Sequence, residues 1–427
     1  MESTTFLVLA LAVLGYALVS KKAQSWILTP PIVFVSVGWI AGPAGFGWLP
    51  HEIDEHLFHL LAELTLVLVL FTDASRIDLK LLRKEHDLPV RLLTLGLPLS
   101  LVVGTAIGVV AGPGLAFWVA AMGAAILAPT DAALGQAVVS SPAVPVRIRQ
   151  TLNVESGLND GIALPAVLLF FSIGCAVEGD QSISYWVSFA LLQITLGPLA
   201  GIAVGLLGGK LLDASEERGW ISESFLGLAT IALAILSYFL ADEIGGNGFI
   251  AAFCAGLTLG NTSKAAESAQ EFAETEGQLL TLLVFTAFGA IMVPEALHHA
   301  SPEAWLYAML MLTVARMLPV ALALSFCRLE WRTILFLGWF GPRGIASLVF
   351  ALLIAGLAPG EHQELLPLIS LTVLLSVFAH GITANPLARR YGASFRESSS
   401  AEGSASEELQ QVQEMPLRIP SDQDSSG

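Results

Sequence analysis

The sequence predicts an all-α polytopic membrane protein, and three observations lead to that fold class. Of the 427 residues, 55% are hydrophobic and only 13% are charged, against roughly 25% charged in a typical soluble domain. The mean hydropathy is +0.72, and the apolar residues gather in runs of about 20, the length of a membrane-crossing helix. So few charges exclude a water-soluble enzyme of this size, and the net charge of -16 excludes a nucleic-acid partner, which needs a basic surface.

Thirteen candidate membrane-spanning segments follow one another along the chain, and we expect a helix in each. They lie within residues 5–20, 27–48, 57–72, 90–111, 115–140, 152–175, 184–209, 220–242, 247–261, 277–294, 303–325, 333–357 and 365–387. The first has no basic stretch before it and is followed by Lys21 and Lys22, so we do not expect a cleaved signal peptide.

The distribution of basic residues tests this count independently. If there are thirteen spans, all but two of the 20 Lys and Arg residues fall on one side of the membrane, and those two, Arg316 and Arg343, fall inside spans. Because basic loops stay in the cytoplasm, we expect a multi-pass protein of the inner cell membrane with its N-terminus outside and its C-terminus cytoplasmic. Residues 1–391 would form the transmembrane domain, and residues 392–427, rich in Ser, Glu and Gln, a disordered cytoplasmic tail.

Two spans carry a proline beside an ionisable residue. Residues 128–131 are Ala-Pro-Thr-Asp in the fifth span, and residues 341–344 are Gly-Pro-Arg-Gly in the twelfth. Proline removes a backbone hydrogen bond, so we expect both helices to be unwound at mid-membrane. Spans seven apart run in opposite directions, and broken helices in two inverted six-helix repeats are typical of the substrate site of a secondary transporter.

Ionisable side chains inside spans are expensive and therefore mark a site. Asp131, Asp160 and Arg343 lie at a similar depth on the fifth, sixth and twelfth spans, with Glu155 slightly shallower. On the sixth span, Ser156 shares a helix face with Asp160, four residues later. Such oxygen ligands suit a small hard cation, and a carboxylate there can hold either a cation or a proton.

With these residues in place, the chain resembles the NhaP-type sodium/proton antiporters of the monovalent cation:proton antiporter superfamily. The resemblance rests on Pro-Thr-Asp at 129–131, Glu-Ser-Gly-Leu-Asn-Asp at 155–160 and Gly-Pro-Arg-Gly at 341–344, and it covers the transmembrane region. It implies that Asp160 carries the exchanged proton or cation and that Asp131 lies beside it.

The resemblance also implies roles for five neighbours. Thr130 and Ser156 would contribute oxygens to a bound Na⁺, which makes them metal ligands together with the two aspartates. Asn159 would order the site by hydrogen bonding, and Glu155 and Arg343 would form a buried ion pair that organises it.

By the same resemblance, the Asn159-Asp160 pair implies electroneutral exchange of one cation for one proton. The fold would contain a six-helix core, about residues 90–175 and 303–387, that moves against a scaffold forming a homodimer. One motif differs from that of many relatives: Asp73 is followed by Ala and Ser, where they have two glycines. We therefore assign Asp73 no role in the site.

Several residues keep alternative interpretations at this stage. Arg316 would either neutralise the acids of the core or extend toward the membrane surface, and Glu63 would face either a cavity or the subunit interface. Six histidines on the predicted outer side are interpreted as ordinary loop residues. The four-residue spacing of Gly201, Gly205 and Gly209 indicates close helix packing.

The functional hypothesis is an electroneutral antiporter of Na⁺, and also Li⁺, for H⁺, and not an enzyme. No nucleotide-binding motif is present, so ion gradients would drive transport, without a cofactor beyond the transported ions. A K⁺/H⁺ antiporter has the same mechanism and remains open. Two other classes are a cation channel and an organic-anion symporter, for which Arg343 would anchor the substrate.

Overall fold

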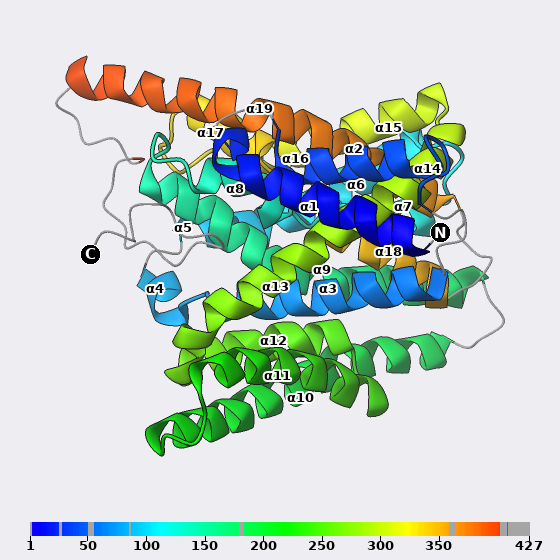
Figure 1. The fold of residues 1–427 in the computed structure, drawn as a ribbon. Helices are drawn as coiled ribbons and strands as arrows, with labels where there is room; N and C mark the ends of the chain where they lie inside the picture. The colour runs from blue at the N-terminus through cyan, green and yellow to red at the C-terminus, as the bar shows by residue number, and fades with distance from the viewer. Residues whose placement is uncertain are drawn as a thin grey trace.

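The structure, a computed structural model, describes residues 2–24, 28–49, 55–84, 87–178, 183–357, 364–401 and residue 408. The regular elements in these residues are helical (Figure 1), which confirms the all-α class. In chain order the helices are α1 (Glu2–Gln24), α2 (Pro30–Ala41), α3 (Glu55–Ser75), α4 (Leu79–Lys84), α5 (Asp87–Arg91), η1 (Leu92–Gly96), α6 (Leu97–Ala111), α7 (Phe117–Ile126), α8 (Ala132–Val139), α9 (Val146–Glu178), α10 (Ile183–Glu217), α11 (Glu223–Glu243), α12 (Gly248–Thr262), α13 (Ala265–Ala287), η2 (Phe288–Met292), α14 (Val293–His298), α15 (Pro302–Leu312), α16 (Val314–Leu324), α17 (Trp331–Trp339), α18 (Ile345–Leu357) and α19 (Leu365–Ala401).

Each of the thirteen predicted segments contains helix. Within the described residues, eight helices are long and apolar enough to cross a membrane by length and composition. Shorter apolar helices at Pro30–Ala41, Phe117–Ile126, Gly248–Thr262 and Ile345–Leu357 accompany them. The exact number of membrane crossings stays a prediction.

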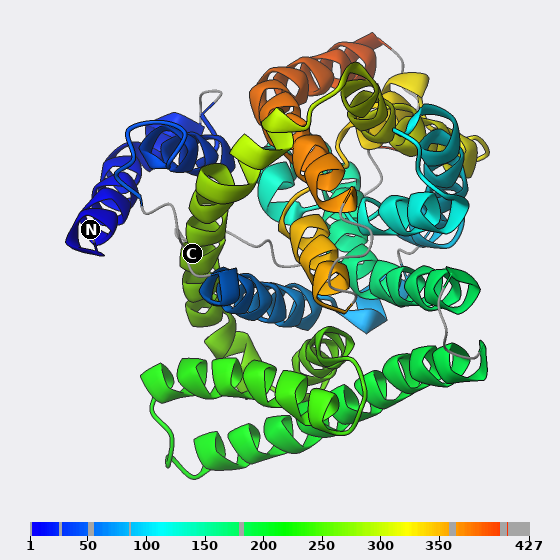
Figure 2. The same ribbon diagram turned by 90° about the vertical axis from the view of Figure 1, so that its right-hand side faces the viewer.

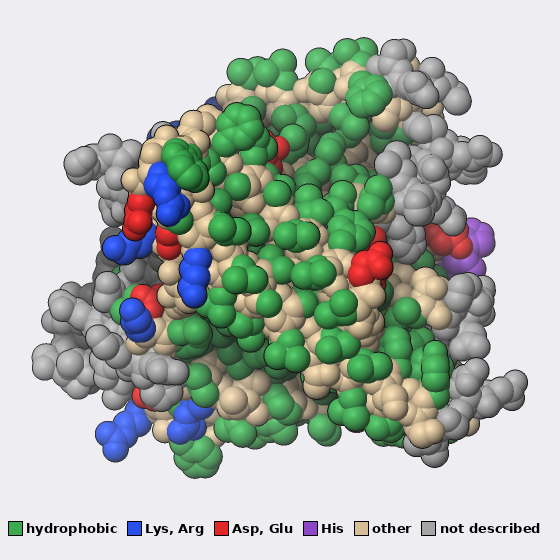
Figure 3. Space-filling model, turned by 90° about the horizontal axis from the view of Figure 1, so that it is seen from below, with side chains coloured by type: hydrophobic (Ala, Val, Ile, Leu, Met, Phe, Trp, Pro, Cys, Tyr) green, Lys and Arg blue, Asp and Glu red, His purple; other side chains and the backbone are tan. Residues whose placement is uncertain are grey.

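The surface composition of the molecule changes along the direction of the helix axes, from charged to apolar. On the face seen in Figure 3, Lys and Arg side chains gather at one end, His lies at the other, and hydrophobic side chains cover most of the region between. Helix α1 begins at the opposite end of the molecule from the end where α19 finishes (Figure 1). An apolar belt between two polar ends is the surface that a bilayer requires.

The helices form two groups (Figure 2). The first contains α1–α3 and α10–α13, and the second contains α5–α9 and α15–α19. The moving core expected at about 90–175 and 303–387 stays a prediction. In the first group, Gly201 and Gly205 of α10 lie against the backbone of Ala251 and Ala255 of α12, so closely that a Cβ would overlap it. The close packing predicted from this glycine spacing is therefore confirmed.

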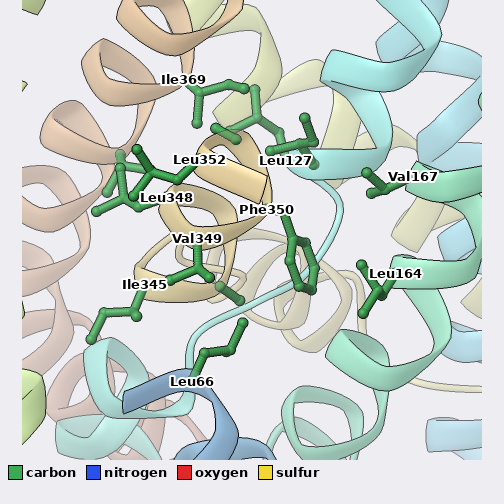
Figure 4. Close-up of a cluster of buried hydrophobic side chains, with 14 of the residues drawn as sticks. Leu66, Leu127, Leu164, Val167, Ile345, Leu348, Val349, Phe350, Leu352 and Ile369 are labelled. Atoms are coloured by element: carbon green, nitrogen blue, oxygen red, sulfur yellow. The ribbon is translucent and has the colours of Figure 1, made fainter. Parts of the chain in front are cut away.

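Helix α18 lies at the centre of the second group (Figure 4). Its fully buried Phe350 points toward Leu164 of α9, and Ile369 of α19 lies on another side. Leu66 of α3, in the first group, also reaches α18, so apolar side chains join the two groups here. Helix α18 is thereby fixed on several sides close to the break that precedes it.

Both predicted breaks are present. Helix α7 ends at Ile126 and α8 begins at Ala132, whereas α17 ends at Trp339 and α18 begins at Ile345. The predicted disordered tail needs a correction, because α19 continues past 391 to Ala401. A helix that is already formed extends at little cost per residue, so a change in composition alone did not end it. The rest of the tail, apart from Glu408, lies outside the described residues.

Candidate ion-binding site at two crossed helix breaks

The two breaks contact each other through Asp131. Its backbone N–H donates to the Pro342 carbonyl at 2.8 Å, and its Oδ2 accepts the Ile345 N–H at 3.0 Å. Its Oδ1 accepts the Leu134 N–H at 3.3 Å. One carboxylate therefore lies at the first turns of both α8 and α18, where unpaired N–H groups and the helix dipole favour negative charge.

Gly344 makes this approach possible. A Cβ at this position would overlap the Asp131 carboxylate, with Oδ2 as the nearest atom. The glycine is needed here because the carboxylate comes so close to the backbone.

Arg343 joins the breaks from the other side. The residue is 2% exposed, and its Nη1 donates to the carbonyls of Ala128 and Pro129 at 2.9 and 3.0 Å. These carbonyls follow the end of α7, where the helix leaves acceptors unused and its dipole favours a cation. The predicted convergence of Asp131 and Arg343 at one level is confirmed.

Glu155 forms a buried ion pair with an arginine, as expected, but that arginine is Arg316. Nη2 of Arg316 donates to Oε2 of Glu155 at 2.8 Å, and Nη1 donates to Oε1. The expected pair between Glu155 and Arg343 is therefore wrong, and of the two interpretations of Arg316 the first holds. The reason is steric: Gly341 has no side chain, and a Cβ there would overlap the Arg316 guanidinium, so the break leaves room for it.

A chain of polar side chains links the first break to α9. The Thr130 hydroxyl lies 2.8 Å from that of Ser156, and Nδ2 of Asn159 donates to Thr130 Oγ1 at 2.6 Å. The Asn159 carbonyl oxygen is buried and has no hydrogen-bond partner among the described residues. Three predicted site residues thus form one hydrogen-bonded cluster, and hydroxyl and amide oxygens are ligand types that suit a small hard cation.

Asp160 is 7% exposed and lies on the face of α9 that also carries Ser156, four residues earlier. The next residue, Gly161, packs so closely on α12 that a Cβ would lie 2.7 Å from the Phe253 ring. Asp160 is therefore next to the contact between the two helix groups. Its part in ion exchange stays a prediction.

Two residues of α19 contact the second break: His380, one of the ionisable candidates within spans, to which the sequence interpretation gave no role, and Ser376, which it missed. Ser376 accepts the Arg343 backbone N–H at 2.6 Å, and His380 Nε2 lies 3.0 Å from the Trp339 carbonyl. His380 was detectable as an ionisable residue within a span. Ser376 carries no such signal, because a serine in an apolar helix commonly bonds its own backbone.

The chain is similar in sequence to known antiporters. The K⁺/H⁺ antiporter NhaP of Alkalimonas amylolytica is 27% identical over 91% of this chain and 67% of its own length. NhaP2, a K⁺/H⁺ antiporter of Shewanella sp. strain ANA-3, is 26% identical over 84% of this chain and 62% of its length. The chain thus spans about two thirds of the length of these relatives.

A solved structure has the same fold. That of the sodium proton antiporter MjNhaP1 from Methanocaldococcus jannaschii superposes with a TM-score of 0.74 at 20% identity and covers 91% of this chain and 99% of its own. At this identity the match concerns the fold alone. Residues 8–390, which contain both breaks and all of α9, match the family described as sodium/hydrogen exchanger, transmembrane, and the chain belongs to that family of transporters.

Proposed function

We propose that the protein is an electroneutral antiporter that exchanges a monovalent cation, Na⁺ and also Li⁺, for H⁺. The observation that carries the proposal is the hydrogen-bonded cluster of buried Thr130 and Asn159 with half-buried Ser156, between the first break and α9, one helical turn from Asp160. Family membership supports the reaction class.

The charges around this cluster explain how it would work. The Glu155 carboxylate is held by both Nη atoms of Arg316, so that pair is balanced and fixed. Asp131 is engaged by backbone N–H groups of α8 and α18. Asp160, one helical turn from Ser156, would be the acid whose charge changes during the cycle, as its place in the Glu-Ser-Gly-Leu-Asn-Asp motif implies: it would hold a proton when no cation is present and release it as the cation binds.

K⁺ is the second candidate substrate, favoured by the names of two relatives, both K⁺/H⁺ antiporters. Hydroxyl, amide and carboxylate oxygens accept either ion, so the ligand types do not discriminate between them. The mechanism at Asp160 would be the same for both.

The protein would act as a homodimer in the inner membrane, with its N-terminus outside and its C-terminus in the cytoplasm. The gathering of Lys and Arg at one end of the molecule (Figure 3) supports this orientation, because basic residues favour the cytoplasmic side.

The test uses purified protein in liposomes with an acidic interior, to which Na⁺, Li⁺ or K⁺ is added outside. Lumenal pH is followed with the membrane potential clamped and then free. Alkalinisation by Na⁺ or Li⁺ at equal rates under both conditions supports electroneutral antiport. A response to K⁺ alone changes the substrate, and current without proton movement identifies a channel.

The site is tested by Asp160→Asn, which keeps the shape of the side chain but cannot release a proton. We expect exchange to fall to the level of empty liposomes while the protein remains folded. Asp242→Asn is the matched control, because Asp242 is exposed near the end of α11, far in sequence from both breaks. Full exchange by Asp160→Asn would refute the site assignment.

A further inference from the structure

The second break removes one particular backbone hydrogen bond. In a continuous helix the Trp339 carbonyl would accept the N–H of the residue four positions later, which is Arg343. Because α17 ends at Trp339 and α18 begins at Ile345, this bond is not formed. Leaving a buried backbone donor unpaired would be costly, so the Arg343 N–H needs another acceptor, whereas the Trp339 carbonyl, which accepts the Gly341 N–H at 2.9 Å, can accept a second donor.

The acceptor for Arg343 and the second donor to Trp339 both come from one turn of α19. Ser376 Oγ accepts the Arg343 N–H at 2.6 Å, and His380 Nε2 lies 3.0 Å from the Trp339 carbonyl oxygen. His380 Nδ1 is 3.1 Å from Ser376 Oγ, and both residues are fully buried. Two side chains four residues apart thus bridge the gap that the missing bond leaves. We call Ser376 and His380 the clasp.

The His380 ring lies between two carbonyls, with Nε2 3.0 Å from that of Trp339 and Nδ1 2.9 Å from that of Ser376. Two atoms that carry only lone pairs repel at such distances, so a ring nitrogen bonds its carbonyl only when it carries a proton, and the clasp needs that proton on Nε2. In the neutral ring, Nδ1 accepts the Ser376 hydroxyl proton, and the hydroxyl oxygen accepts the Arg343 N–H. In the charged ring, Nδ1 donates to the Ser376 carbonyl at 2.9 Å. Nε2 donates to Trp339 in both cases.

The two breaks create four helix ends, and at each of them a side chain bonds the unpaired backbone groups. The clasp does so at the end of α17. Arg343 lies at the end of α7, and Asp131 lies at the starts of α8 and α18. At the end of α17, the Trp339 carbonyl accepts from Gly341 N–H at 2.9 Å and from His380, and the Leu337 carbonyl lies 3.5 Å from Arg316 Nη2. His380 is a side chain from outside both breaks that bonds the backbone carbonyl of the last residue of α17.

We propose that His380 is a positioning residue for the ion site. It holds the second break open in the geometry that directs the Arg343 guanidinium to the Ala128 and Pro129 carbonyls, immediately before Thr130. A change at His380 reaches the cation ligands through Arg343 and the first break, although His380 itself touches no ligand. This inference rests on the proposed function, because positioning matters only if the ion binds there.

The test compares three substitutions at one position. His380→Gln keeps an N–H near the place of Nε2, His380→Asn keeps only the contact with Ser376, and His380→Leu removes both. We expect the apparent KM for the cation to rise about tenfold in His380→Leu, because losing about one hydrogen bond at the break would weaken cation binding by that factor. The rise should be smaller in His380→Asn. His380→Gln should stay within about twofold of the wild type, since its donor to Trp339 remains.

A second measurement does not depend on transport. Deuterium uptake of residues 340–345, followed by mass spectrometry on detergent-solubilised protein, should be faster in His380→Leu and in Ser376→Ala than in the wild type. Thr383→Val is the matched control: Thr383 also lies on α19 and accepts from the Trp339 indole at 2.9 Å, so it bonds the side chain of Trp339 and not the backbone of residues 339–345. We expect wild-type uptake and KM in this variant.

The outcomes separate the clasp from the proposed function. Faster uptake in His380→Leu but not in His380→Gln, in a protein that exchanges no cation, would keep the clasp and reject the function. In an active protein, unchanged uptake and KM in His380→Leu would overturn the clasp, as would an equal effect of Thr383→Val. If His380→Leu does not fold, Ser376→Ala decides by the same two criteria.

Discussion

The two helix breaks look alike in the sequence but contribute different things to the site. The first break offers polar side chains of its own: Thr130 bonds Ser156 and Asn159, and Asp131 bonds the backbone of α18. The second break contains Gly-Pro-Arg-Gly and offers no side-chain oxygen. Instead its two glycines leave space, one for Arg316 and the other for Asp131.

The two inverted halves therefore contribute different groups to the candidate site. In the proposed site the first break and α9 would supply the oxygens that a cation needs, whereas the second break supplies positive charge and room for the groups that hold the first in place. Substitutions in the first break should therefore change cation affinity before stability. Substitutions around the second should change stability at least as much as affinity.

The largest expected effect is at Arg316, behind the second break. Arg316→Gln leaves the buried Glu155 carboxylate without its partner, and an uncompensated buried charge costs about 3–5 kcal/mol. We expect the lowest Tm of the series in detergent and little folded protein in the membrane. Adding Glu155→Gln should restore most of the lost Tm, because the charge is then gone.

Arg343→Gln is the control for Arg316→Gln, because it also removes a buried arginine. The partners of Arg343 are the neutral carbonyls of Ala128 and Pro129, and a glutamine amide can still donate to one of them. Its loss of Tm should be clearly smaller than that of Arg316→Gln. Equal losses would contradict the assignment of Arg316 as the counter-ion of Glu155.

The next effect separates the two glycines of the second break. Both Gly344→Ala and Gly341→Ala introduce a Cβ into an occupied space, which costs about 1–3 kcal/mol in a packed core. Gly344→Ala displaces Asp131 and should raise the apparent KM for the cation. Gly341→Ala displaces Arg316 and should lower Tm with a smaller change in KM. The paired Tm and KM measurements contradict the comparison if the two variants behave alike.

The features of this site that the sequence predicts are those determined within a single helix. Pro129 and Pro342 each remove a helix hydrogen bond beside an ionisable residue, and this combination made both breaks predictable. Proline alone is not enough, because continuous helices contain Pro165, Pro198, Pro319 and Pro386. The four-residue spacing of Ser156 and Asp160 likewise fixes their common face. These features need only the chain itself and helix geometry.

Contacts that depend on how helices rotate against one another were not predictable in this way. Arg316 and Arg343 both lie inside spans, and the sequence gives no measure of which guanidinium reaches Glu155. The choice follows from the space beside Gly341, which exists only once α16 and α17 are packed. The same holds for Ser376, which gains its role from the N–H that the distant break releases.

A smaller effect is expected in the first break. Thr130→Val keeps the shape of the side chain but removes its hydroxyl, which contacts Ser156 and Asn159. Losing about 1 kcal/mol of binding corresponds to a rise of about fivefold in the apparent cation KM, with Tm little changed. Thr372→Val is the control, because the buried Thr372 hydroxyl bonds only Leu368 of its own helix among the described residues. A rise in KM that is equal in both variants would show that any buried hydroxyl has this effect.

The smallest expected effect concerns the far end of the second broken helix. Glu408 is buried, and its Oε1 accepts the Glu330 N–H at 2.7 Å and the Thr333 hydroxyl at 3.1 Å, at the start of α17. A carboxylate at a helix start contributes about 0.3–1 kcal/mol. Glu408→Gln keeps the acceptor and loses the charge, so Tm should fall slightly and less than in Glu408→Ala. Because α17 is also tied at its other end by His380, the break should keep its geometry. The apparent cation KM should therefore match the wild type in Glu408→Gln, and a rise as large as that of Thr130→Val would mean that the tail residue controls the site through α17.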